Sequence, residues 1–154
     1  MTSGHQKMKF KSKILTSGDK IPASEKVSAV FLIALKDQQI VAIRNHRGWD
    51  IPAGHVEEKE KILEALRREA QEEASMTFTN PIPFVIVTSD SQDPKYKEKC
   101  MVGFAVKEFQ LNDFVPAPDS KERKLMEIEE FLALYEQDKE NMRSMIDKAK
   151  YILK

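Results

Sequence analysis

The sequence contains a single cysteine, Cys100, and no long hydrophobic run. One thiol cannot form an intrachain disulfide, which indicates a reducing, soluble compartment. The longest purely apolar run, residues 29–35, is far shorter than the roughly 20 residues that cross a bilayer. The Lys-rich start is not followed by an apolar stretch and a small-residue cleavage site, so no signal peptide is expected. We therefore expect a cytoplasmic protein without a membrane partner.

The chain also lacks an excess of either charge, since its 154 residues include 25 Lys or Arg and 25 Asp or Glu. A protein that binds nucleic acid without regard to sequence draws its affinity from clustered Lys and Arg, so neutrality argues against a nucleic-acid polymer as partner. Gly and Pro are few, at 5 and 7, and 41% of the residues are hydrophobic. This composition predicts one globular domain over residues 1–154. Within it, residues 1–13 are interpreted as a flexible basic segment.

Hydrophobic periodicity divides the rest of the chain into strands and helices. Two apolar runs, 27–35 and 40–43, flank a short polar connection and predict a hairpin. Further strands are predicted at 49–52, 84–89, 99–109 and 123–128, and helices at 58–75, 129–137 and 141–154. The polar stretch 90–98 is predicted to be a loop. Strands interspersed with a few helices indicate an α/β or α+β fold, in which helices cover a sheet.

The helix predicted at 58–75 carries a cluster of acids. Glu69, Glu72 and Glu73 share a sector of the helical wheel little more than about 100° wide, at the edge of its apolar face. Carboxylates placed there repel one another and are costly to desolvate. A divalent cation with oxygen ligands, Mg²⁺ or Mn²⁺, would resolve the conflict and would also accept phosphate oxygens from a substrate. The alternative is a charged surface helix whose acids pair with neighbouring Lys and Arg.

The residues around these acids follow a longer pattern. It reads Gly, five residues, Glu, seven residues, Arg-Glu, an aliphatic, any residue, Glu-Glu, any residue, Gly and an aliphatic. Its charged positions and its first Gly are matched by Gly54, Glu60, Arg68, Glu69, Glu72 and Glu73. Residues 54–76 thus resemble the Nudix box of the Nudix (MutT-like) hydrolase superfamily, and residues 48–54 are similar to its usual lead-in.

This chain departs from the pattern at two positions. Ser75 stands where the box closes with Gly, and Ala53 stands where many members have a second Gly. A residue other than Gly in a left-handed helix cap costs on the order of 1 kcal/mol, so we expect this helix end to be capped differently. Ala53 should be harmless, because by resemblance that position supplies a main-chain carbonyl to the metal.

The resemblance implies a fold, a reaction and a set of roles. The fold is the Nudix α/β/α sandwich, a mixed sheet flanked by helices. The reaction is hydrolysis of a diphosphate linkage in a nucleoside diphosphate derivative, by water attack on phosphorus assisted by Mg²⁺ or Mn²⁺. The implied metal ligands are Glu69, Glu72, Glu73 and Ala53, with Glu69 or Glu72 as the catalytic acceptor of the water's proton. Glu60 and Arg68 would form a supporting ion pair.

A further acid outside the box often completes such sites. Glu122, ahead of a predicted strand, is our candidate for a catalytic acid, and Glu98 and Glu108 compete with it. Each of the three has an alternative interpretation as a solvated surface acid.

Three residues before the box are candidates for substrate contacts. Arg44 and Arg47 could meet the phosphates of a substrate, although a solvated hairpin end explains them equally well. Trp49 could stack on a base, but a place in the core is the commoner one. His55 is expected to point into solvent, and Cys100 to be a small core residue.

Two other functions share this fold. A binding or regulatory module without turnover would be expected to have lost box acids, and all of them are present here. Isopentenyl diphosphate isomerase carries its catalytic Cys before the box, whereas Cys100 follows it. The preferred partner is a small nucleotide-type substrate, with nucleoside triphosphates, dinucleoside polyphosphates and nucleotide sugars all left open. A homodimer through the apolar face of the C-terminal helix is also left open.

Overall fold

The computed structural model describes residues 10–15, 19–89 and 99–154, so the loop expected at 90–98 lies outside the described residues. The strands are β1 (Phe10–Ile14), β2 (Val27–Lys36), β3 (Gln39–Asn45), β4 (Gly48–Asp50), β5 (Ala53–His55), β6 (Met76–Thr79), β7 (Ile82–Ser89), β8 (Cys100–Val106), β9 (Glu108–Leu111) and β10 (Glu122–Glu127). The helices are α1 (Ile62–Ala74), α2 (Ile128–Leu134) and α3 (Lys139–Ile152), with a short 3-10 turn at Ser24–Lys26.

The main sheet is mixed, with the strand order β1-β7-β8-β2-β3-β10. β2 and β8 run parallel, and the other neighbours in this order are antiparallel. β6 and β9 form a separate antiparallel pair. The predicted hairpin is confirmed, since Leu35 pairs with Ile40 and Lys36 with Gln39 across its turn.

β2 lies between two hydrophobic clusters and is buried over most of its length. Successive side chains alternate between them: Val30, Leu32 and Ala34 belong to the cluster that includes α1, and Phe31, Ile33 and Leu35 to the cluster that includes α2 and α3. A nearly continuous apolar run is the pattern of a strand covered on both faces.

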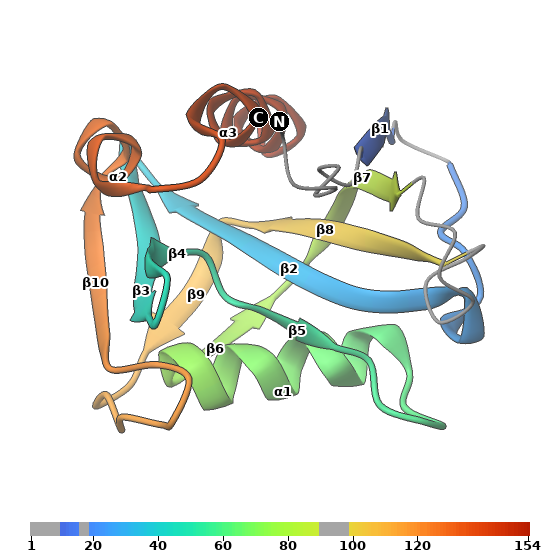
Figure 1. The fold of residues 1–154 in the computed structure, drawn as a ribbon, viewed down its shortest axis with the longest axis horizontal. Helices are drawn as coiled ribbons and strands as arrows, with labels where there is room; N and C mark the ends of the chain where they lie inside the picture. The colour runs from blue at the N-terminus through green and yellow to red at the C-terminus, as the bar shows by residue number, and fades with distance from the viewer. Residues whose placement is uncertain (1–9, 16–18, 90–98) are drawn as a thin grey trace, which may run out of the picture.

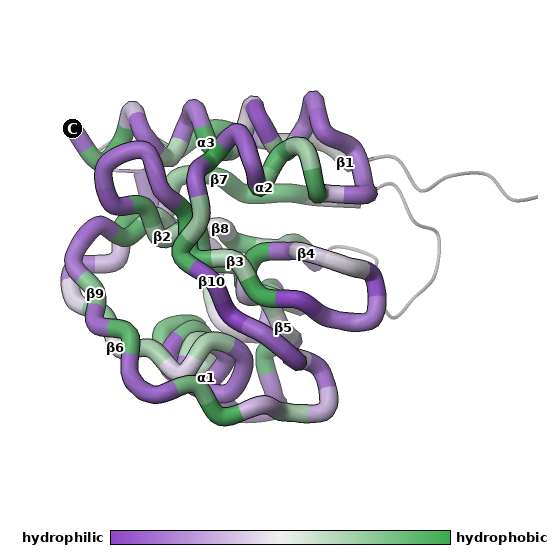
Figure 2. The backbone as a smooth tube through the Cα atoms, turned by 90° about the vertical axis from the view of Figure 1, so that its left-hand side faces the viewer, coloured by the Kyte–Doolittle hydropathy of each residue, from purple (hydrophilic) through white to green (hydrophobic). Residues whose placement is uncertain are grey.

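The helices therefore form two outer layers around the sheet. α1 lies on one side, while α2 and α3 lie on the other (Figure 1). The side of α3 that faces away from the sheet is mostly hydrophilic, and the side that faces the sheet is mostly hydrophobic (Figure 2). The predicted fold class, a mixed sheet flanked by helices, is confirmed. No helix in the described residues is long and apolar enough to cross a membrane.

β5 occupies a place that the sequence did not predict. The strand predicted at 49–52 ends before this segment, yet Ala53 and Gly54 pair with Phe31 and Val30 of β2. β4 in turn folds back on β3, where Trp49 lies opposite Arg44. The start of the 54–76 segment therefore lies against β2 before α1 begins, because the backbone of β2 is available for pairing at residues 29–31.

α1 begins later than predicted, at Ile62 rather than near residue 58. Lys59 has a positive φ of 66°, which a right-handed helix does not allow. The Glu60 N–H donates to the Glu57 carbonyl at 3.0 Å, and the Glu60 side chain accepts the Glu57 N–H at 2.9 Å. These contacts close a turn, which replaces the first predicted helical turn.

α1 ends in the left-handed cap that we expected Ser75 to avoid. Ser75 has φ 48° and ψ 48°, and its N–H donates to the carbonyls of Ala70 and Gln71. The expectation of a different cap is therefore wrong. Because a side chain in this region costs on the order of 1 kcal/mol relative to Gly, other contacts of Ser75 must offset the strain.

Three further segments differ from the sequence prediction. The strand expected at 99–109 is divided into β8 and β9, which belong to different sheets. β6 was not predicted. Phe10–Ile14, most of which we assigned to a flexible segment, forms β1 and pairs with β7. Each difference depends on a partner strand distant in sequence, which periodicity alone does not reveal.

Candidate functional site

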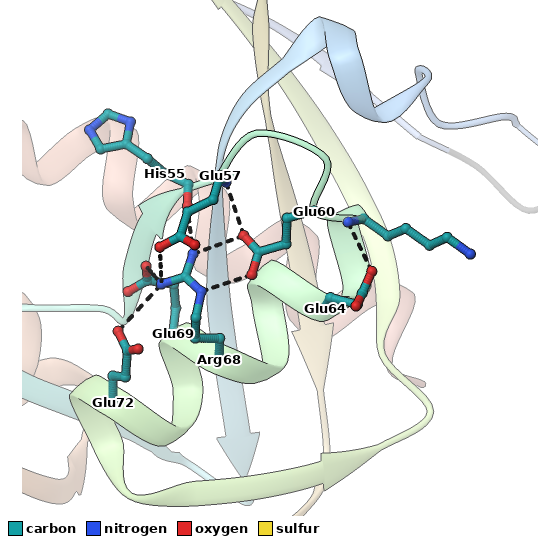
Figure 3. A network of polar contacts seen from close by, with 8 residues as sticks. His55, Glu57, Glu60, Glu64, Arg68, Glu69 and Glu72 are labelled. Atoms are coloured by element: carbon teal, nitrogen blue, oxygen red, sulfur yellow. Dashed lines mark hydrogen bonds and ion pairs between the residues drawn. The ribbon is translucent and has the colours of Figure 1, made fainter.

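Arg68 of α1 is the centre of an ionic network between the helix and the turn that precedes it (Figure 3). Its guanidinium makes two parallel hydrogen bonds to the Glu60 carboxylate, from Nε at 2.8 Å and from Nη2 at 2.9 Å. Nη2 also donates to the His55 carbonyl at 2.9 Å. The Glu60 side chain is only 13% exposed, and the hydrogen bond from Arg68 lowers its pKa. The structure thus contains the Glu60–Arg68 ion pair suggested by the sequence.

The same guanidinium reaches two of the clustered acids. Arg68 Nη1 donates to Glu69 at 2.7 Å and to Glu72 at 3.3 Å. Glu69 is 12% exposed at its side chain, whereas Glu72 is 56% exposed. Burial raises the pKa of Glu69, and the hydrogen bond from Arg68 partly offsets this effect. Arg68 therefore orients an otherwise poorly solvated carboxylate.

Gly54 explains how the Glu69 carboxylate is accommodated. A Cβ built on Gly54 would overlap the carboxyl group of Glu69. Any side chain at position 54 would therefore displace this carboxylate from the backbone of β5. Glycine is needed here for close approach, not for an unusual backbone angle.

Glu73 lies beside Glu69 against the same strand. The Ala53 N–H donates to the Glu73 carboxylate at 2.7 Å. The pKa of Glu73 is raised to about 7, mainly by burial and to a smaller extent by the negative charges of Glu69, Asp50 and Asp119, while the Ala53 hydrogen bond acts in the opposite direction. Among the described residues, no Lys or Arg forms an ion pair with Glu73. A buried anionic group without a cationic partner is costly, and a bound cation would relieve that cost.

These acids line a cleft of about 1090 Å³. Glu69, Glu72 and Glu73 lie on its α1 side, and Ala53 and Gly54 lie beside them. Residues 115–119, between β9 and β10, also line it. The basic side chains at the cleft belong to His46, Arg47, His55, Arg68 and Lys99, so negative and positive groups face the same space.

Asp119 is the acid that the sequence interpretation missed. It lines the cleft, and its charge acts on Glu73. The neighbouring Ser120 Oγ donates to the Glu73 main-chain carbonyl at 2.5 Å, which holds this part of the chain against the end of α1. The available signal was its place directly after the Pro116-Ala117-Pro118 break, where a turn leaves the next residue free to point into the cleft.

Glu122 and Arg44 lie away from these acids. Arg44 donates from Nε to Glu122 at 2.8 Å across the β3–β10 pair. Side chains alternate along β10, and Met126 belongs to the cluster on the α2 and α3 face of the sheet. Glu122, an even number of residues earlier, falls on that face and not on the face of α1. Neither residue lines the cleft in the described part of the chain.

The other candidates outside the box divide between cleft and core. Arg47 lines the cleft and approaches Asp50 at 3.5 Å. Trp49 instead packs against the hydrophobic cluster beneath α2 and α3, which is the core place considered for it. His55 is exposed and Cys100 is buried in the hydrophobic cluster that includes α1, as expected, and both also line the cleft. Glu108 accepts hydrogen bonds from Thr79 and Asn80, and Glu98 lies outside the described residues.

The donor set fits a hard divalent cation, because carboxylate and main-chain carbonyl oxygens are the ligands that Mg²⁺ and Mn²⁺ prefer. In residues 10–15, 19–89 and 99–154, no three His, Cys, Asp or Glu side chains are already gathered as a metal cluster. Glu69 and Glu72 are held on the Arg68 guanidinium instead. The Glu69 carboxyl fills the space that a side chain at Gly54 would take, and Glu73 accepts the N–H of the adjacent Ala53, so a cation bound between these two carboxylates would satisfy both groups.

Comparison with known proteins gives a family and a fold. The model of the family described as NUDIX domain matches residues 25–149. No curated protein sequence matches the chain significantly. Among solved structures, an Ap4A hydrolase of C. elegans in a binary complex is similar with a TM-score of 0.58 and 19% identity, over 81% of this chain and 97% of that one. A MutT protein of Bacillus halodurans is similar with a TM-score of 0.54 and 23% identity, over 69% of this chain and 71% of that one. A pyrophosphohydrolase of Bacillus subtilis is similar with a TM-score of 0.53 and 18% identity, over 75% of this chain and 70% of that one. At these identities the structural likeness concerns the fold.

Proposed function

This chain belongs to the Nudix hydrolase family, and from that premise we propose that it cleaves a diphosphate linkage in a nucleoside diphosphate derivative with Mg²⁺ or Mn²⁺. The observation that carries the proposal is the convergence of Glu69 and Glu73 on the backbone of β5, at Gly54 and Ala53. Both carboxyls have raised pKa values because they are buried, and the charge of Glu69 raises the pKa of Glu73 further. A divalent cation would offset the charge of Glu73, for which the described residues supply no Lys or Arg partner.

Glu69, Glu72, Glu73 and the main-chain carbonyl of Ala53 are the groups that would hold the metal. When bound, the metal neutralises phosphate charge and lowers the pKa of a coordinated water. Arg68 keeps Glu69 turned toward β5, and Glu60 keeps Arg68 in place. An oxygen of Glu72, more exposed than the other two, is able to accept the proton of the attacking water.

The remaining groups of the cleft suit the substrate. His46, Arg47 and Lys99 line it and can meet phosphate oxygens outside the metal. The similar structures include an Ap4A hydrolase and a pyrophosphohydrolase, which supports a phosphate anhydride as the bond that is cleaved. The choice among nucleoside triphosphates, dinucleoside polyphosphates and nucleotide sugars is left to experiment.

The proposal is tested with a substrate panel. The protein is incubated with a nucleoside triphosphate, Ap4A and ADP-ribose in turn, each with Mg²⁺, with Mn²⁺ and with EDTA, and the nucleotide products are separated by anion-exchange chromatography. We expect turnover of at least one class with metal and none with EDTA. Hydrolysis in ¹⁸O-labelled water should place the label on a phosphate of the product. Absence of turnover across the panel would favour a binding module without catalysis.

Replacing Gly54 by Ala should weaken metal binding and activity together. The new Cβ would overlap the Glu69 carboxylate and push it away from Glu73. We expect the affinity for Mn²⁺, measured by electron paramagnetic resonance, and kcat/KM each to fall by roughly 10- to 100-fold, the range seen when a ligand loses its support.

The neighbouring Ala53→Gly variant is the matched control for this change. It alters the same strand but keeps the main-chain N–H that contacts Glu73. We expect Mn²⁺ affinity and kcat/KM within about twofold of the unmodified protein, a spread too small to reflect the loss of a hydrogen bond. Equal losses of Mn²⁺ affinity and kcat/KM in both variants would show that any substitution in β5 is harmful. The close approach of Glu69 to Gly54 would then have no specific role.

A further inference from the structure

One wall of the cleft is the segment between β9 and β10, residues 112–121, which we call the 112–121 loop. Val115, Pro116, Ala117, Pro118 and Asp119 all line the cleft from this loop. The loop makes a tight turn at its far end, where Ala117 and Ser120 exchange two main-chain hydrogen bonds of 2.8 and 3.0 Å. Its position decides where Asp119 stands relative to Glu73.

The loop is attached to the end of α1 through main-chain and side-chain contacts. Ser75 accepts the Asn112 N–H on its main-chain carbonyl at 2.9 Å and the Val115 N–H on its hydroxyl oxygen at 3.0 Å. Ser120 donates to the Glu73 carbonyl at the other end of the loop. Carbonyls at a helix C-terminus have no partner within the helix, so the loop supplies partners that α1 requires.

Arg123 fastens the base of the loop to the same helix end. Its Nη1 donates to the carbonyls of Ala74 at 2.8 Å, Ser75 at 3.2 Å and Asn112 at 2.6 Å. A positive charge at a helix C-terminus is also favourable electrostatically. The base of the loop is therefore fixed by Arg123, and its cleft-lining part is held by Ser75 and Ser120.

Ser75 is unusual because it combines a left-handed backbone with a buried hydroxyl. Its φ of 48° lies in the region that favours glycine, and the residue is 2% exposed. Glycine, which closes the Nudix pattern at this position, would make the same main-chain contacts without strain. Glycine would not supply an acceptor for the Val115 N–H. The hydroxyl is thus what this chain gains from its departure from the pattern.

We propose that Ser75 is a positioning residue, whose hydroxyl holds the 112–121 loop and with it Asp119, whose charge acts on the carboxylate of Glu73. The inference rests on the proposed function for its effect on catalysis. Its structural part, the attachment of the loop by the Ser75 hydroxyl, is independent of any substrate.

Two variants separate the hydroxyl from the backbone strain. Ser75→Gly removes the hydroxyl and relieves the left-handed strain, whereas Ser75→Ala removes the hydroxyl and keeps the strain. We expect the Tm of Ser75→Gly to exceed that of Ser75→Ala by about 2–4 °C. We expect kcat/KM to fall about tenfold in both variants, because both lack the acceptor for the Val115 N–H. A purely structural role would instead make activity follow Tm, with Ser75→Gly close to the unmodified protein.

Amide hydrogen exchange of Val115, followed by NMR without substrate, is the second readout. We expect at least tenfold faster exchange in both variants than in the unmodified protein. Asn80→Gly is the matched control, since Asn80 also has a positive φ of 52° but contacts Glu108 on the surface. This control should leave the exchange of Val115 and kcat/KM unchanged.

The outcomes distinguish the inference from the proposed function. Unchanged exchange of Val115 in both variants would overturn the inference, whether or not a substrate is turned over. Fast exchange with full activity in Ser75→Ala would also overturn it, because the loop would then be free without consequence. Failure of the unmodified protein to hydrolyse any member of the substrate panel would count against the proposed function, while the exchange of Val115 would still report on the attachment.

Discussion

Replacing Glu73 by Gln is expected to lower kcat/KM by roughly 10²- to 10³-fold, the cost typical of removing one positioned electrostatic group from an active site. Gln keeps the size of the side chain and an oxygen that can accept the Ala53 N–H, so the backbone of β5 should stay in place. What is lost is the negative charge beside Glu69. The measurement is steady-state hydrolysis of whichever panel substrate turns over, with saturating Mg²⁺.

Glu64→Gln provides the matched control for this variant. Glu64 is an exposed acid on the same helix, and its carboxylate accepts the Lys61 N–H at 3.1 Å, a contact that Gln can replace. Its kcat/KM should stay within about twofold of the unmodified protein. Near-normal activity of Glu73→Gln, with Mn²⁺ affinity also unchanged, would contradict the role of metal ligand proposed for Glu73.

The second large effect concerns the stability of the metal-free protein. The pKa of Glu73 is about 7 in the folded chain, against an ordinary value of 4.5 for a solvated Glu. Between these values the folded protein binds a proton that the unfolded chain has released, so the free energy of unfolding must fall as pH rises. After allowance for partial solvent exposure, we expect Glu73 to contribute a loss of about 2 kcal/mol between pH 4.5 and about pH 7.

Urea unfolding in EDTA at pH 5 and pH 8, on the unmodified protein and on Glu73→Gln, measures this contribution. The variant cannot ionise at position 73, so its free energy of unfolding lacks this loss. The difference in free energy of unfolding, variant minus unmodified protein, should therefore be about 2 kcal/mol larger at pH 8 than at pH 5. Glu69 also has a raised pKa, but it is present in both proteins and largely cancels from the difference. A difference independent of pH would show that Glu73 ionises at its ordinary pKa.

Addition of Mn²⁺ should reverse this order of stability at pH 8. A ligand that binds the folded state alone stabilises it by an amount that grows with its concentration. The unmodified protein, with an ionised Glu73, should gain more from the metal than Glu73→Gln. The same carboxyl would thus cost stability without metal and supply it with metal, as expected for a residue retained for its function.

The residues whose partners are near in sequence were the ones that could be predicted. The hairpin between β2 and β3 depends on two apolar runs and a short turn, and the sequence located it correctly. α1 was located for the same reason, because apolar residues recur along it at helical spacing. The pattern from Gly54 to Glu73 also lies within one short segment, and it was sufficient to suggest the family that the family model then confirmed.

What only the tertiary structure decided are contacts between distant segments. Side-chain alternation could not show which face of the sheet Glu122 occupies, since that depends on how β10 pairs with β3. The entry of Asp119 into the cleft, the close approach of Glu69 to Gly54 and the contact between Ser75 and Val115 likewise join residues far apart along the chain or on different elements. The sequence by itself therefore determined the family and the helix that carries the acids, because local periodicity and spacing encode them. Which further residues complete the site was decided by long-range pairing and packing, which no local pattern encodes.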